Sequence, residues 1–163
     1  MARGNDSLPT LGLAFIRFVT GLVLLSHGWR WVSEAPIEGS VIEKSVNSSL
    51  GELGSALTTW GEFVLLENPD ALALLWQWAA LLVGLLFVLG ALIRPAGALA
   101  VLFLSHGLIY GPVEHELPFL LLLVSCLACS ASGAGRRMGL DAVFDQHFPS
   151  WITWKKRPTS IFP

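Results

Sequence analysis

Charged side chains are scarce in this chain. Only 13% of its 163 residues are Asp, Glu, Lys or Arg, whereas soluble domains carry about 25%. Apolar residues make up 53%, and the mean hydropathy is +0.63. A water-facing globule explains this composition poorly, so we expect a protein that lies in the lipid bilayer. The net charge of −2 gives no general electrostatic case for nucleic acid, and we expect no nucleic-acid partner.

Cysteine is also rare, and its placement gives no indication of a disulfide framework. Cys126 and Cys129 are the two cysteines, and both lie in one apolar run. A C-x-x-C pair indicates redox or metal chemistry in a soluble protein. Here small residues surround the pair, which is typical of close helix packing in membranes. The sequence also contains no flavin or nucleotide motif and no metal cluster, so any redox work requires a partner or a bound cofactor.

Four apolar segments are long enough, or nearly long enough, to cross a bilayer. A helix needs about 20 residues to cover about 30 Å of hydrocarbon. We expect spans at about 10–32, 71–93, 95–110 and 116–132. Because lipid cannot satisfy open backbone groups, all four should be helical. The sequence therefore predicts an all-α integral membrane four-helix bundle, with residues 1–163 forming a single membrane domain.

The second and third spans are separated by very few residues. Pro95 suits the first turn of a helix, where its missing N–H is not needed. We therefore expect an antiparallel hairpin with its hinge at Arg94-Pro95.

Basic residues are distributed unevenly around the spans. The loop 33–70 contains one basic residue, Lys44, among seven acidic ones. The other basic residues outside the spans lie before the first span, at the hinge and in the tail: Arg3, Arg94, Arg136, Arg137, Lys155, Lys156 and Arg157. The excess of positive charge predicts cytoplasmic N- and C-termini, with the long loop on the extracytoplasmic side. The expected location is the cytoplasmic (inner) membrane of a prokaryote.

Apolar residues recur at helix-like spacing in the long loop, which predicts one or two short helices on the outer face of the bundle. A flexible linker is the alternative.

In the cytoplasmic tail, 133–163, aromatic residues precede Lys155-Lys156-Arg157. This pattern predicts a segment that lies in the membrane interface.

Polar side chains gather near the predicted outer ends of the spans. His27 and Arg30 are three apart on the first, and His106 and Tyr110 are four apart on the third, so each pair shares a helix face. The stretch Glu114–Glu116 precedes the fourth on the same side. If these groups converge, they offer hydrogen-bond donors and proton carriers, which the carbonyl oxygens of a quinone head group need. The candidate quinone head-group pocket is His27, Arg30, His106, Tyr110 and Glu116.

Each of these residues also has a plainer interpretation. Glu114–Glu116 is also explained as a hydrated turn, and His27 and His106 as hydrogen-bonded residues of the bundle interior. The two histidines are also possible axial ligands of a haem or chlorin. Arg17, inside the first span, is expected either to reach toward the cytoplasmic interface or to pair inside the bundle.

Three stretches give the chain a family resemblance. The first is residues 13–17 with Gly21 and 27–30, the second is residues 84–96, a glycine-spaced span that ends at Arg-Pro, and the third is residues 133–141, which read GAGRRMGLD. Over about residues 11–141 the chain resembles the DoxX/DoxD membrane proteins, which include the small subunit of thiosulfate:quinone oxidoreductase. Three positions depart from the family pattern: Gln77 replaces an acid, Gly139 replaces a serine and Trp31 replaces a lysine.

The resemblance implies a small membrane subunit associated with a quinone-linked electron-transfer complex. Such a subunit would dock against other membrane subunits and would not be a self-sufficient enzyme. The alternative is a non-catalytic structural subunit of a larger complex, and the loss of an acid at Gln77 favours it. A third possibility is a bundle that carries a haem or pigment.

Overall fold

The computed structural model describes residues 8–34, 36–51, 54–110, 116–132 and 139–141, with only the backbone described for residues 8–10 and 116. All its regular elements within these ranges are helical. They are α1 (Leu8–Ser33), α2 (Gly39–Leu50), α3 (Ser55–Trp60), a π-helical turn η1 (Gly61–Leu65), α4 (Pro69–Leu89), α5 (Ile93–Tyr110) and α6 (Glu116–Ser132).

Three of these helices are long and apolar enough to cross a membrane, namely Leu11–Ser33 within α1, Pro69–Leu89 and Ile93–Tyr110. A shorter apolar helix covers Leu117–Ser132. Large apolar side chains point outward, such as Phe15 and Leu121, which are 67% and 60% exposed. Apolar surface on this scale indicates a membrane protein whose helices contact lipid.

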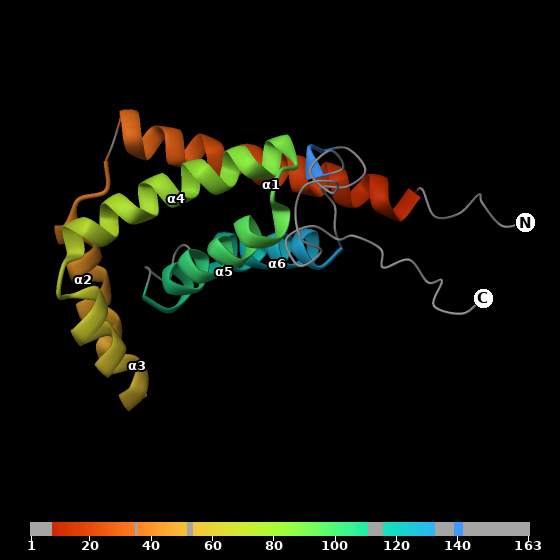
Figure 1. The fold of residues 1–163 in the computed structure, drawn as a ribbon. Coiled ribbons are helices and arrows are strands. Elements are labelled where there is room, and N and C mark those ends of the chain that lie inside the picture. The colour runs from red at the N-terminus through yellow and green to blue at the C-terminus, as the bar shows by residue number, and fades with distance from the viewer. Residues whose placement is uncertain (1–7, 35, 52–53, 111–115, 133–138, 142–163) are drawn as a thin grey trace, which may run out of the picture.

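The four long helices pack side by side in alternating directions (Figure 1). α1 packs against α4, α4 against α5, α5 against α6, and α6 against α1. They enclose a common core, which includes Val83, Phe87, Ala100, Leu104 and Cys126.

Glycine permits a very close approach between α1 and α4. A Cβ atom on Gly28 would lie 2.4 Å from the backbone nitrogen of Leu81, and one on Gly84 would lie 2.3 Å from that of Leu25. Without side chains at these positions the two backbones come into contact, as is common between helices in membranes.

The turn between α4 and α5 differs from the predicted hinge. α4 ends at Leu89, and Gly90 follows with φ 67°. A glycine in this left-handed conformation ends helices readily because it has no Cβ to clash. Pro95 lies in the first turn of α5, as its missing N–H predicts, but Arg94-Pro95 lies inside that helix and does not form the turn.

Asp141, which follows α6 in the chain, closes this turn. Its carboxylate accepts hydrogen bonds from the backbone N–H groups of Leu92 (2.6 Å) and Ile93 (3.2 Å) at the start of α5. Its own N–H donates to the carbonyl oxygen of Gly90 at 2.9 Å. The carboxylate thereby satisfies amides that would otherwise lack partners at a helix N-terminus.

Arg17 of α1 lies at the same place. It is 2% exposed, it interacts electrostatically with Asp141, and its Nη1 lies where a Cβ on Gly90 would need room. Of the two expectations for Arg17, the structure bears out pairing within the protein. Arg17, Gly90 and Asp141 come one each from the three stretches that carry the family resemblance, so those stretches meet in space.

At the opposite end, α2, α3 and η1 form a cap that lies across the helix axes, beside α4 and α5 (Figure 1). α2 packs against α4 and α5. A second core cluster holds this cap in place, formed by Ile42, Val46, Leu65, Ala73 and Tyr110. The prediction of short helices in the loop 33–70 is therefore confirmed. The predicted interfacial segment of the tail lies outside the described residues.

Candidate functional site

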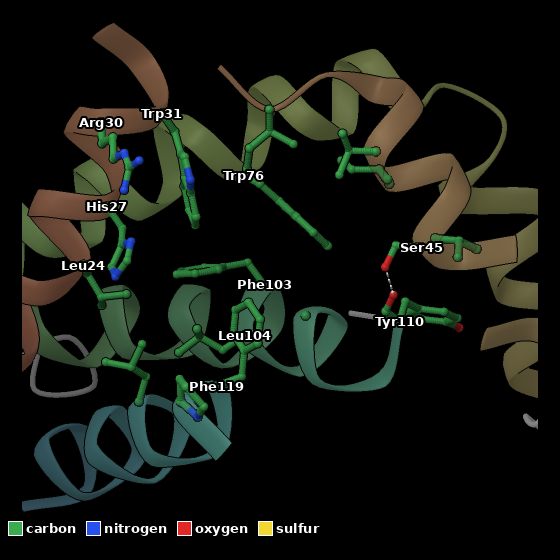
Figure 2. Close-up of a pocket in the computed structure, with 17 residues that line it drawn as sticks. Leu24, His27, Arg30, Trp31, Ser45, Trp76, Phe103, Leu104, Tyr110 and Phe119 are labelled. Carbon is green, nitrogen blue, oxygen red and sulfur yellow. Dashed lines mark hydrogen bonds between the residues drawn. The ribbon is translucent and has the colours of Figure 1, made fainter. Parts of the chain in front are cut away.

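A cavity of about 460 Å³ lies between the cap and the ends of the four long helices, and Figure 2 shows its lining. This size falls within the range of small-molecule sites in proteins. The lining is mostly apolar, and all four long helices and α2 contribute to it: Leu24, His27, Arg30, Trp31, Ile37, Val41, Ile42, Ser45, Val46, Trp76, Phe103, Leu104, Gly107, Tyr110, Pro118, Phe119 and Leu122.

His27 and Arg30 provide the cavity's titratable nitrogen groups. They lie on the same face of α1, as their spacing predicts, and both side chains line the cavity (Figure 2). The imidazole ring of His27 lies 5.7 Å from the ring of Trp31, tilted by 39°. The pair therefore places a guanidinium donor and an imidazole, which can donate or accept, beside an aromatic surface.

Aromatic side chains form much of the rest of the cavity wall. Trp31, Trp76, Phe103 and Phe119 come from four different helices. Flat rings of this kind pack well against a planar ligand. The sequence analysis did not identify Trp31 and Trp76 as lining residues.

The tryptophans occur in pairs two positions apart, Trp29 with Trp31 and Trp76 with Trp78. Trp29 and Trp78 are 61% and 53% exposed, whereas Trp31 and Trp76 are partly buried against the core. The two members of each pair lie about 200° apart around a helix of 3.6 residues per turn, so one faces inward and the other outward. That offset was the signal in the sequence that could have identified the lining tryptophans.

Tyr110 also lines the cavity, but its hydroxyl group is engaged elsewhere. The phenol donates to the carbonyl oxygen of Leu57 in α3 at 2.8 Å. The Ser45 hydroxyl of α2 donates to the carbonyl oxygen of Tyr110. Tyr110 therefore contributes its ring to the wall and its polar atoms to attachment of the cap. Sequence reasoning missed Ser45, which no motif marks.

His106 lies outside this lining. α5 runs in the same direction as α1, so both histidines lie toward the cap (Figure 1). However, Nε2 of His106 is 3.1 Å from the indole nitrogen of Trp60 in α3, and Nδ1 is 2.6 Å from the carbonyl oxygen of Leu102. A carbonyl only accepts, so Nδ1 carries the proton and Nε2 accepts from the indole N–H. Both ring nitrogens are occupied, which removes the support for paired axial ligation with His27.

The remaining polar residues singled out in the sequence do not line the cavity or lie outside the part of the chain whose side chains are described. Glu116 begins α6, and the structure describes its backbone only; Glu114 and His115 lie outside the described residues. Gln77, the departure from the family pattern, is buried and is not part of the cavity lining. Its Nε2 donates to the carbonyl oxygen of Ile37 at 2.9 Å. A carboxylate cannot donate this bond, so an amide at this position has a structural explanation.

Cys126 and Cys129 are fully buried in the core where α6 meets α1 and α5. The Cys129 thiol lies 3.9 Å from the carbonyl oxygen of Leu13. This surrounding favours the packing interpretation of the pair. Within the described ranges, no three His, Cys, Asp or Glu side chains are placed to hold a metal ion.

The arrangement has the chemistry of a binding site for a planar, largely apolar molecule with hydrogen-bond acceptors at one side. Aromatic rings supply contact area, and His27 and Arg30 supply the donors. Of the five residues predicted to form the site, the structure brings His27, Arg30 and Tyr110 to one cavity. In comparisons with known proteins, no family model, curated protein or solved structure matches this chain.

Proposed function

We propose that this chain is a small membrane subunit that binds a quinone head group in the cavity beneath its cap, as part of a quinone-linked electron-transfer complex of the DoxX/DoxD type. The observation that carries the proposal is the placement of His27 and Arg30 against an aromatic wall. Quinone carbonyl oxygens accept hydrogen bonds, and the ring of the quinone stacks on aromatic side chains.

The membrane arrangement belongs to the same proposal. α1, α4, α5 and α6 cross the bilayer as a four-helix bundle, with both termini on the cytoplasmic side of a prokaryotic inner membrane. Support comes from the alternating helix directions (Figure 1), the apolar segment Leu117–Ser132, and the distribution of basic residues in the sequence.

Cysteine labelling tests this orientation. Lys44 is exposed on α2, and Leu140 is 41% exposed beyond α6. An impermeant maleimide should label the Lys44→Cys variant in intact cells and the Leu140→Cys variant only after permeabilisation. If residue 140 is labelled in intact cells and residue 44 only after permeabilisation, the topology is the reverse of the proposed one. If both are labelled equally in intact cells, they do not lie on opposite sides of the membrane.

Quinone binding is measurable through the protein's own fluorescence. Trp31 and Trp76 line the cavity, so a bound quinone should quench their emission. The Arg30→Gln variant should weaken binding about 10- to 100-fold, because a hydrogen bond from a charged donor contributes about 1.5–3 kcal/mol. The His27→Phe variant should weaken binding about 2- to 10-fold, since an ordinary hydrogen bond contributes about 0.5–1.5 kcal/mol. Lys44→Gln is the matched control, since Lys44 is cationic, lies on α2 and is not part of the lining.

Two outcomes would count against the proposal. If the unmodified protein in lipid nanodiscs does not quench with added quinone, the cavity is not a quinone site. If Arg30→Gln, His27→Phe and Lys44→Gln all bind as tightly as the parent protein, quinone binds elsewhere.

A non-catalytic accessory role is the second candidate, and one observation favours it. Tyr110 and His106, two of the five predicted site groups, use their polar side-chain atoms to hold the cap. His27 and Arg30 remain to contact a ligand. These two groups are enough to bind a quinone, but they provide few proton carriers for its reduction or oxidation. Purification from native membranes distinguishes the two roles: an accessory subunit co-purifies with a larger complex and leaves quinone turnover unchanged when its cavity residues are substituted.

A further inference from the structure

The exposed residues of the cavity lining gather on one side. Every lining residue of α5 is buried, as are Ile42 and Val46 of α2 and Leu24 of α1. The exposed members are His27 and Arg30 of α1, Val41 of α2 and Pro118 of α6. The cavity is therefore closed toward α5 and has its mouth at the rim formed by α1, α2 and α6.

Helix packing explains why the mouth lies there. α2 rests on α4 and α5, which seals that half of the end. α1 and α6 pack against each other too, and one of their contacts joins Cys129 to Leu13 at the other end of the bundle. Near the cap the cavity itself separates them, with His27 on one side and Pro118 on the other.

The surface beside the mouth on α6 is apolar. Leu117, Leu120 and Leu121 are 68%, 44% and 60% exposed, and Trp29 of α1 is 61% exposed at the level of His27 and Arg30. Exposed leucines indicate contact with lipid, and an exposed tryptophan near a helix end is typical of the membrane interface. The gap between α1 and α6 therefore faces the outer part of the bilayer.

We infer that the ligand enters this cavity sideways from the bilayer, between α1 and α6, and that it is a lipid-soluble molecule whose chain remains in the membrane. The inference rests on the proposed function. It adds the route by which the ligand enters and the location of the ligand's apolar chain. The cavity accommodates a ring-sized head group. His27 and Arg30 at the rim contact the head group as it enters, and the long apolar chain stays beside Leu121 in lipid.

A bulky label at the mouth tests the route. The Pro118→Cys variant is labelled with pyrene maleimide and reconstituted in vesicles; the native thiols are buried. A quinone with a long isoprenoid chain is delivered from a second vesicle population, and tryptophan quenching is followed in time. The label should slow association about tenfold or more, because it stands in the entry path. Leu117→Cys, labelled in the same way, is the matched control: it is adjacent on α6, 68% exposed and not part of the lining.

The outcomes separate this inference from the proposed function. Slower association with the Pro118 label, but not with the Leu117 label, supports lateral entry. Equal rates for the two labelled proteins overturn it while leaving quinone binding intact. If the parent protein, carrying no label, binds no quinone, the proposed function fails and the route fails with it.

Discussion

The indole N–H of Trp60 donates to Nε2 of His106 across 3.1 Å, which connects α3 to α5 over 46 positions of sequence. The ring of His106 also stacks on that of Tyr110, with centroids 6.3 Å apart. Because Tyr110 in turn bonds Leu57 and Ser45, one end of α5 holds both α2 and α3. The cap is therefore attached by a small group of polar contacts besides its apolar cluster.

Replacing the donor should loosen the cap selectively. Trp60→Phe keeps an aromatic ring but leaves Nε2 of His106 without its donor, which should cost about 1 kcal/mol. Hydrogen exchange at the amides of α3 should become faster, while exchange in α4 should stay unchanged. Trp78→Phe is the control, because Trp78 is 53% exposed on α4. Equal exchange in both variants would show that this bond does not hold α3.

Substitution of the glycines between α1 and α4 should strongly reduce stability. Gly28→Ala and Gly84→Ala each place a Cβ within 2.4 Å of backbone atoms of the facing helix, which cannot move aside as a side chain can. Overpacking of this kind costs about 1–3 kcal/mol. Gly12→Ala provides a control in α1 with nothing within 4 Å of the added Cβ; it should be neutral or stabilising by about 0.5–1 kcal/mol. Unfolding in mixed detergent micelles measures all three, and equal stabilities would contradict the close packing.

Removing the carboxylate of Asp141 should weaken the turn between α4 and α5. Asp141→Ala removes the acceptor of two backbone N–H groups and the negative charge beside Arg17, with an expected cost of about 2–4 kcal/mol. Asp141→Asn retains one acceptor oxygen and should lose less. Glu43→Gln, an exposed position on α2, serves as the control. If Asp141→Ala unfolds at the same detergent fraction as the parent protein, the carboxylate does not stabilise this end.

Introducing an acid at position 77 should destabilise this chain. In Gln77→Glu the donor to the carbonyl oxygen of Ile37 is lost, and an ionised carboxylate would face that oxygen. The expected cost is about 1–3 kcal/mol at neutral pH, because the group is buried. Asn47→Asp, exposed on α2, makes the same chemical change without burial and should have little effect. A Gln77→Glu variant as stable as the parent protein would contradict the assigned role of this amide.

The positions of the four long helices could be predicted from the sequence because the length of an apolar segment is a local property of the chain. Residues 10–32 and 116–132 match α1 and α6 to within a few positions, and the spacing of His27 and Arg30 correctly placed both on one face. The end of α4 was missed because Gly90 lies within an unbroken apolar run. In its left-handed conformation Gly90 contacts Asp141 and Arg17, which are distant in sequence.

The candidate site was predicted only in part because depth along a helix is easier to infer than direction around it. Both histidines were expected near the outer ends of their spans, and because α1 and α5 run in the same direction, both lie toward the cap (Figure 1). Their side chains face different neighbours, since α3 provides Trp60 as a partner for His106. No feature of the sequence indicated that α3 would fold back onto this part of α5.

The position of Asp141 has a consequence for biosynthesis. The carboxylate that caps α5 is made 49 residues after Leu92, so the start of α5 is synthesised well before its acceptor exists. The first amides of α5 must therefore rely on water, lipid head groups or the insertion machinery until the last helix is complete. A nascent chain that stops short of Asp141 would contain all four hydrophobic helices and still lack the group that closes their shared end.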